Sequence, residues 1–148
     1  MNRKAVELLR SATFISKLGA PSILDGIEKM LAAVAGNPAV LDLNSFRRAV
    51  LERQKMNPPF APSGVAFPHA RTDAVQALVV GVATLASPLP ADAINIRLMF
   101  LIGIPKTATQ EYLELMSFLT RNLRTPSAVE ELCRITDKDQ FLGALAAS

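Results

Sequence analysis

The chain has 148 residues, half of them hydrophobic, and a formal net charge of +3. That length suits one domain with a substantial core, so we expect a single domain over residues 1–148. No apolar run approaches the ~20 residues that cross a bilayer, and the charged start is unlike a signal peptide, which predicts a cytoplasmic protein with no direct membrane insertion. The small, dispersed basic excess and the lack of Trp argue against nucleic-acid binding.

The chain contains one histidine, His69, and one cysteine, Cys133. Protein zinc sites take three or four ligands, and no motif surrounds either residue, so we expect no metal and no other cofactor. A single cysteine also excludes an intramolecular disulfide. We interpret Cys133 as a structural residue without a chemical role.

The first third of the chain is predicted to be helical. Apolar residues recur at helical spacing over residues 21–36, with a proline in the first turn and a Gly-Asn-Pro stop at the end. A second helix is expected over residues 43–55, where Phe46, Val50 and Arg53 share one stripe. An arginine in line with two core residues is a candidate functional side chain. The alternative is an arginine whose stem simply packs along the helix.

The segment after this helix, residues 56–64, contains three prolines and a glycine and is expected to be a loop. The apolar residues 65–67 that follow predict a short strand that stops at Pro68 and places His69 at its tip. Imidazole has an unperturbed pKa of ~6.5, so a neutral nitrogen is available near pH 7 for acid/base work or nucleophilic attack. The alternative is a histidine that only packs at a strand end.

Two apolar runs, residues 78–85 and 96–104, have the length and the Val and Ile content of strands buried on both faces. The proline-containing residues 87–92 between them are expected to form a turn. Thr107 and Gln110 then have the spacing of a capping box, which predicts the start of a helix.

The last third is again helical, with a buried stripe that includes Tyr112, a helix over residues 125–134 and a final helix over residues 137–146. Helices before and after a hydrophobic sheet favour a three-layer α/β/α fold.

Several segments together resemble, in order and spacing, the fructose/mannitol/nitrogen-type enzyme IIA of the bacterial phosphoenolpyruvate-dependent sugar phosphotransferase system. They are Leu51-Glu52-Arg53, Gly64-Val65-Ala66-Phe67-Pro68-His69, Val79-Val80-Gly81-Val82, Leu98–Pro105 and Gln110–Leu115. The resemblance covers about residues 20–146. It implies one domain with a mixed central sheet between helices.

The resemblance also implies a function. In that family, the histidine of the Pro-His pair accepts phosphate from an HPr-type phosphodonor protein, and an upstream arginine holds the phosphoryl group. By this resemblance His69 is the nucleophile and Arg53 the clamp, while Arg71 is a lower-ranked substrate-binding candidate. The phosphoryl group would then pass to a IIB domain or serve as a signal to a regulatory target protein.

The chain departs from the family pattern at three places. Tyr112 stands where many members carry a second histidine, so we treat it as a third candidate catalytic residue, although a tyrosine on a buried stripe is first a core residue. The loop before the Pro-His segment is rich in proline, which removes backbone N–H donors. The family more often places an acidic residue after the arginine, whereas here the acidic Glu52 precedes Arg53 and Gln54 follows it. These departures leave a second hypothesis open, an enzyme IIA-like regulatory binding module with weak or lost phosphotransfer.

Overall fold

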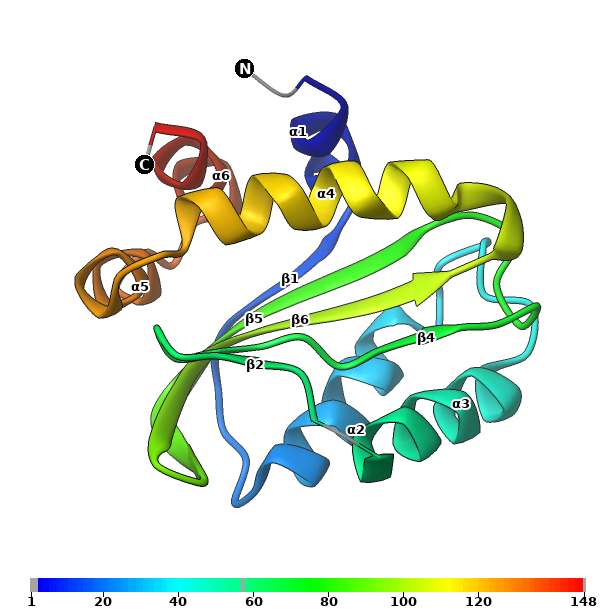
Figure 1. Cartoon of the computed structure of the whole chain (residues 1–148), viewed down its shortest axis with the longest axis horizontal. Coiled ribbons are helices and arrows are strands. Elements are labelled where there is room, and N and C mark those ends of the chain that lie inside the picture. The colour runs from blue at the N-terminus through cyan, green and yellow to red at the C-terminus, as the bar shows by residue number, and fades with distance from the viewer. Residues whose placement is uncertain (1–2, 57, 148) are drawn as a thin grey trace.

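The computed structural model describes residues 3–56 and 58–147, which form six α-helices and six strands (Figure 1). The helices are α1 Arg3–Arg10, α2 Ile23–Val34, α3 Leu43–Met56, α4 Thr109–Asn122, α5 Pro126–Cys133 and α6 Lys138–Ala147. The strands are β1 Thr13–Leu18, β2 Phe60–Ala61, β3 Val65–Ala66, β4 His69–Arg71, β5 Val79–Ala91 and β6 Ile94–Ile104. A short 3-10 turn, η1 Lys106–Ala108, precedes α4.

The strands form one mixed sheet in the order β1-β5-β6-β3-β2. β5 and β6 are antiparallel, as are β2 and β3, whereas β1 runs parallel to β5. β3 pairs in parallel with the middle of β6, at Leu98 and Met99, and β4 pairs in parallel with its end, at Ile102 to Ile104. β6 therefore runs through the centre of the sheet and aligns β3 and β4 along one side.

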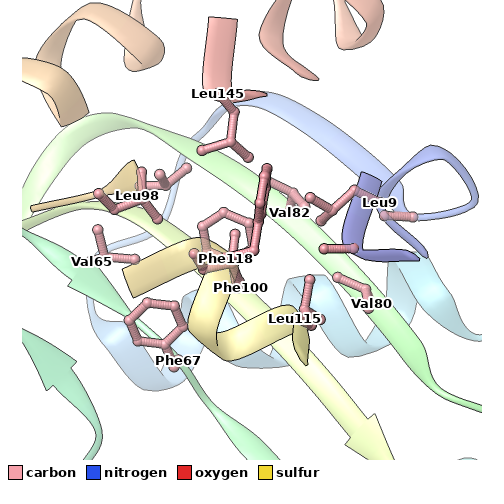
Figure 2. Close-up of a cluster of buried hydrophobic side chains, with 14 of the residues drawn as sticks. Leu9, Val65, Phe67, Val80, Val82, Leu98, Phe100, Leu115, Phe118 and Leu145 are labelled. Carbon is pink, nitrogen blue, oxygen red and sulfur yellow. The ribbon is translucent and has the colours of Figure 1, made fainter. Parts of the chain in front are cut away.

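Helices cover both faces of this sheet. α1, α4, α5 and α6 lie on one side and α2 and α3 on the other (Figure 1). Alternate residues of β5 and β6 therefore pack into two separate apolar clusters, one under each layer. Figure 2 shows the cluster under α4, in which Phe100 of β6 and Phe118 of α4 are buried together. The predicted three-layer α/β/α fold with a mixed central sheet is confirmed.

The close approach of α3 to the sheet depends on a glycine. A Cβ at Gly103 of β6 would lie 2.8 Å from the ring of Phe46 in α3 and 3.2 Å from Val75. Real side chains do not approach so closely, so the hydrogen of Gly103 is what lets α3 pack against this part of the sheet. Phe46 and Val50 are completely buried, as their predicted stripe requires.

The N-terminal third is not wholly helical, contrary to the sequence prediction. Residues 13–18 form the edge strand β1, which pairs with β5 from Thr13 to Leu18. Most of its residues are only half-buried, so the segment has neither the continuous apolar run nor the clean alternation that identifies a strand. Pro21 also lies outside α2, because the N-cap is Ser22, whose hydroxyl accepts a hydrogen bond from the Asp25 amide at 3.2 Å.

The predicted turn over residues 87–92 was also wrong, since β5 continues to Ala91 and the hairpin turns at Asp92. Pro88 and Pro90 are tolerated because β1 ends opposite Leu85, which leaves the far part of β5 paired only with β6. Asp92 has a φ of 53°, the left-handed conformation that Asp accepts in turns.

The predicted capping box did not form either. Thr107 lies inside η1, and α4 begins two residues later at Thr109, with no side-chain hydrogen bond at its N-cap. The helix that starts at Thr125 has the expected cap, because the Thr125 hydroxyl accepts from the Ala128 amide at 3.2 Å. Within the described part of the chain, no helix combines the length and apolar character required of a membrane span.

Candidate functional site

His69 lies at an open edge of the sheet. The sequence predicted that it follows a strand, but β3 ends at Ala66, and after Phe67-Pro68 the histidine is the first residue of β4. Pro68 has no N–H to donate, yet its carbonyl accepts from the Ile102 amide at 3.0 Å, and the chain stays on β6. β4 pairs only with β6, so the proline break places His69 where its side chain is half-exposed.

The backbone two residues earlier holds the imidazole ring. Nδ1 of His69 lies 2.7 Å from the carbonyl oxygen of Phe67. A carbonyl oxygen can only accept, so Nδ1 carries the proton in this hydrogen bond and Nε2 keeps its lone pair. Phe67 is itself fixed, because its ring stacks on Phe100 in the core and its amide donates to the Pro59 carbonyl at 2.9 Å. No sequence pattern indicated this carbonyl contact.

The surroundings favour the neutral imidazole. Partial burial lowers the pKa of His69 below its ordinary value of 6.5, and the positive charge of Arg53 lowers it further, whereas the Phe67 hydrogen bond acts in the opposite direction. The ring is therefore largely unprotonated at neutral pH. A neutral imidazole with an unprotonated Nε2 is the form of histidine that can attack an electrophile.

Tyr112 of α4 lies beside the histidine. The centroids of the two rings are 5.8 Å apart, and their planes are tilted by 33°. Tyr112 is half-buried against the apolar cluster under α4. Burial raises the pKa of its hydroxyl, and the charge of Arg53 lowers it. The hydroxyl is protonated at neutral pH and can donate a hydrogen bond.

Arg53 comes from the opposite helical layer, on the last turn of α3. Its positive charge acts on both His69 and Tyr112, so Arg53 lies near both rings. The side chain is half-buried, and its neighbour Gln54 is more than nine-tenths buried. The packing of Phe46 against Gly103 holds α3 against β4 and so positions Arg53 at the sheet edge.

Arg71 is the third residue of β4. Alternate strand residues point to the same face, so Arg71 lies on the same face as His69 and one pleat further along. It is exposed, unlike the buried Ala70 between them. The structure thus places Arg71 near the site, at its solvent side.

A polar contact that the sequence did not reveal anchors the loop before this segment. The buried Ser63 hydroxyl donates to the Leu123 carbonyl at the end of α4 at 2.6 Å. The following residue, Gly64, has a φ of 103°, and a Cβ there would lie 2.8 Å from the Asn95 carbonyl. Only glycine fits this turn. The loop that leads to His69 is therefore tied both to β6 and to the helix that carries Tyr112.

The family model described as "Phosphoenolpyruvate-dependent sugar phosphotransferase system, EIIA 2" matches residues 7–148. The chain belongs to this EIIA family. Its members are components of a phosphotransferase system and include sugar-specific and nitrogen-regulatory proteins. The match begins earlier than the segment inferred from the sequence, about residues 20–146, and so takes in β1 and part of α1.

Individual EIIA proteins are similar over most of the chain. The fructose-specific EIIA component of Haloferax volcanii is 29% identical over 130 residues, which cover 85% of this chain and 84% of that protein. The crystal structure of the nitrogen regulatory protein IIA-Ntr from Neisseria meningitidis superposes with a TM-score of 0.79 at 20% identity, covering 93% of this chain and 94% of that one.

A further similar structure shows an EIIA protein with a partner. It is the complex of enzyme IIA for mannitol with phosphorylated enzyme IIB for mannitol from Escherichia coli. Its matching chain has a TM-score of 0.77 and 19% identity, and the alignment covers 93% of this chain and 96% of that chain. At this identity the similarity establishes the shared fold.

Proposed function

We propose that this EIIA protein is a histidine phosphocarrier that accepts a phosphoryl group on Nε2 of His69 from an HPr-type protein. The observation that carries the proposal is the hydrogen bond from Nδ1–H to the Phe67 carbonyl, which leaves Nε2 as the unprotonated ring nitrogen. The lowered pKa of His69 keeps that nitrogen neutral at physiological pH. Membership of the EIIA family supplies the reaction class.

The transfer needs no cofactor. The lone pair of Nε2 attacks the phosphorus of a phosphohistidine on the donor, and the donor's nitrogen leaves with the electron pair of the broken N–P bond. With the Nδ1 proton retained, the phosphorylated ring becomes cationic. The Phe67 carbonyl then accepts a charge-assisted hydrogen bond, which stabilises the product form.

The neighbouring side chains suit the charge of the phosphoryl group. Arg53 supplies a planar guanidinium whose charge already reaches His69, and catalysis of phosphoryl transfer consists mainly of positioning and of neutralising oxygen charges. The Tyr112 hydroxyl is protonated and can donate to a phosphoryl oxygen. Arg71 adds a second positive charge at the solvent side, where a docking protein would meet it.

The phosphoryl group then passes to a IIB domain or acts as a regulatory signal to a target protein. A IIB partner is supported by the similar mannitol complex and a regulatory target by the similar IIA-Ntr fold. We also propose a cytoplasmic location, which membership of this phosphoenolpyruvate-dependent system supports.

A second candidate function is a regulatory binding module with weak or lost transfer. One observation favours it: the residue whose ring lies beside His69 is Tyr112, and the chain has no second histidine to share a proton there. The two functions differ in whether His69 is phosphorylated rapidly. They do not differ in fold.

The experiment is a phosphorylation assay with phosphoenolpyruvate, the first enzyme of the system and an HPr-type donor, read by intact mass. We expect one phosphoryl group on the wild type, none on His69→Ala and one on the control Cys133→Ser. Circular dichroism checks that both variants fold. Phosphorylation of His69→Ala at the wild-type stoichiometry would place the acceptor elsewhere, and a folded wild type that is phosphorylated only over hours would favour the binding module.

A further inference from the structure

A cavity of about 310 Å³ lies where β1, β5, β6 and α5 meet. It is separate from the histidine site. Arg97 of β6 lines the cavity, and Ile102, five residues further along the same strand, pairs with His69. At about 3.3 Å per residue the two sites are roughly 17 Å apart along β6.

The cavity has a positive lining. Lys17, Arg97 and Arg134 contribute three positive charges, and Glu130 contributes one negative charge, which leaves a net charge of +2. Glu130 forms an ion pair with Arg97 at 3.6 Å. The remaining wall includes the apolar Leu85 and Pro88.

Lys17 is held in a backbone conformation that lysine disfavours. Its φ is 54°, and the pairing register between β1 and β5 shifts between Ile15 and Leu18 around it. The Lys17 amide donates to the hydroxyl of Thr84, a completely buried side chain, at 2.8 Å. Glycine would adopt this φ without strain, whereas lysine adopts it at a cost in conformational free energy. We interpret the lysine at this position as an indication that its side chain has a role. Such strain is typical of functional sites.

Several of these charges act on Cys133, which also lines the cavity. Its thiol donates to the Arg97 carbonyl at 3.2 Å and is half-buried. Burial raises the pKa of the thiol to about 11, Glu130 raises it as well, and Arg97 and Lys17 lower it. Charges from three elements therefore act on the thiol, which is partly withdrawn from water, whereas Lys17 and Arg134 are exposed. Coulomb interactions are stronger at the inner wall, beside Cys133, than on an open surface.

We propose that this cavity binds a small dianionic molecule, a phosphomonoester or a dicarboxylate. Two negative charges match the net charge of the lining, and the guanidinium of Arg134 offers the paired donors that phosphate and carboxylate oxygens accept. The apolar Leu85 and Pro88 contact the carbon skeleton. The volume is at the lower end of small-molecule sites, ~300–1,000 Å³, which suits a ligand with a short carbon chain.

The experiment is isothermal titration calorimetry of the full chain with glycerol 3-phosphate, succinate and neutral glycerol at a fixed ionic strength. We expect one-to-one binding of at least one dianion with a dissociation constant below about 1 mM and no binding of glycerol. The tighter of the two dianions identifies the ligand chemistry. Binding should be unchanged in His69→Ala. Absence of binding by both dianions overturns the proposal.

Three variants test the location. Lys17→Gly removes the cation and relieves the backbone strain, so we expect an affinity loss of about tenfold or more with an unchanged or raised unfolding midpoint. Arg134→Gln should lower the affinity by a similar factor while the backbone conformation of Lys17 stays unchanged. Arg48→Gln removes an exposed arginine from α3, on the other face of the sheet, and should bind as the wild type does. Unchanged affinity in Lys17→Gly or Arg134→Gln, or an equal loss in Arg48→Gln, overturns the proposed site.

Discussion

His69 and Cys133 are both half-buried side chains that can act as nucleophiles, and both lie near positively charged residues. Burial disfavours the charged form of each. For the imidazole, the neutral form is the nucleophile, so burial keeps His69 ready to react at neutral pH. For the thiol, the charged form is the nucleophile, so burial keeps Cys133 unreactive.

The comparison shows that burial favours the reactive form of His69 and the unreactive form of Cys133. It also gives a physical reason for the different roles that we propose for the two ends of the sheet. At the His69 end the cations surround a nitrogen that is available for a covalent bond. At the Cys133 end the cations surround a cavity with no reactive group, which suits reversible binding.

The largest effect that we expect is on the alkylation rate of Cys133, which should be much lower than that of an ordinary cysteine. A thiol of pKa about 11 is ionised to about 0.1% at pH 8, whereas an ordinary cysteine of pKa ~8.5 is ionised to about a quarter. The reaction with iodoacetamide should therefore be roughly 200-fold slower than that of free cysteine. Mass spectrometry over time measures the rate, and denatured protein is the control. A native rate close to the denatured one would remove the contrast between the two residues.

Removing the charge beside His69 should have the next largest effect. Arg53→Ala loses a charge-assisted hydrogen bond to the phosphoryl group, so the rate of phosphorylation should fall by about tenfold or more. Arg53→Lys should recover part of the rate, because it restores the charge without the planar fork. The matched control is Arg48→Ala on the same helix, where the exposed side chain contacts Ser45. Equal rates for Arg53→Ala and the wild type would exclude a role for the guanidinium.

Tyr112 should give a smaller change, and its variants separate two roles. If the hydroxyl donates to the phosphoryl group, Tyr112→Phe slows transfer a few-fold, and Tyr112→His preserves or raises the rate. If the ring only packs against the core, Tyr112→Phe changes nothing, while Tyr112→Ala lowers the free energy of unfolding by about 2 kcal/mol, less than for a fully buried aromatic. Rates and unfolding midpoints of all three variants decide between these roles.

The pH dependence is expected to be the smallest effect. His69 is the sole histidine, so one imidazole titrates in the NMR spectrum, and its midpoint should lie below 6.5. Between that pKa and 6.5 the unfolded chain binds more protons than the folded chain, so the free energy of unfolding rises as pH rises through this window. His69→Gln should remove this slope. A midpoint above 6.5 would mean that the Phe67 hydrogen bond outweighs burial and the Arg53 charge.

Much of the fold was predictable because its signals are local. The helices around Phe46, Val50 and Val129 and the central strands around Phe100 follow from apolar spacing. β1 was missed because its residues are only half-buried, and the end of β5 was missed because prolines are allowed once β1 has ended. Both depend on which strands are neighbours, which the local sequence does not state.

For the site, the Pro-His pair and the helical stripe of Arg53 indicated the residues that the structure brings together. The Phe67 carbonyl that fixes the imidazole tautomer could not be predicted, since any residue supplies a carbonyl. The cavity near Lys17 was equally hidden. It depends on a positive φ and on three parts of the chain that are distant in sequence: β1, the β5–β6 hairpin and α5.

The most direct test of the account is the position of the phosphoryl group on the imidazole. Nitrogen-15 NMR of the phosphorylated protein distinguishes a phosphorus on Nε2 from one on Nδ1 of His69. Because the Phe67 carbonyl holds the Nδ1 proton, we predict phosphorylation of His69 at Nε2, with the Nδ1–H hydrogen bond retained. A phosphoryl group on Nδ1, or on any residue other than His69, would contradict the account.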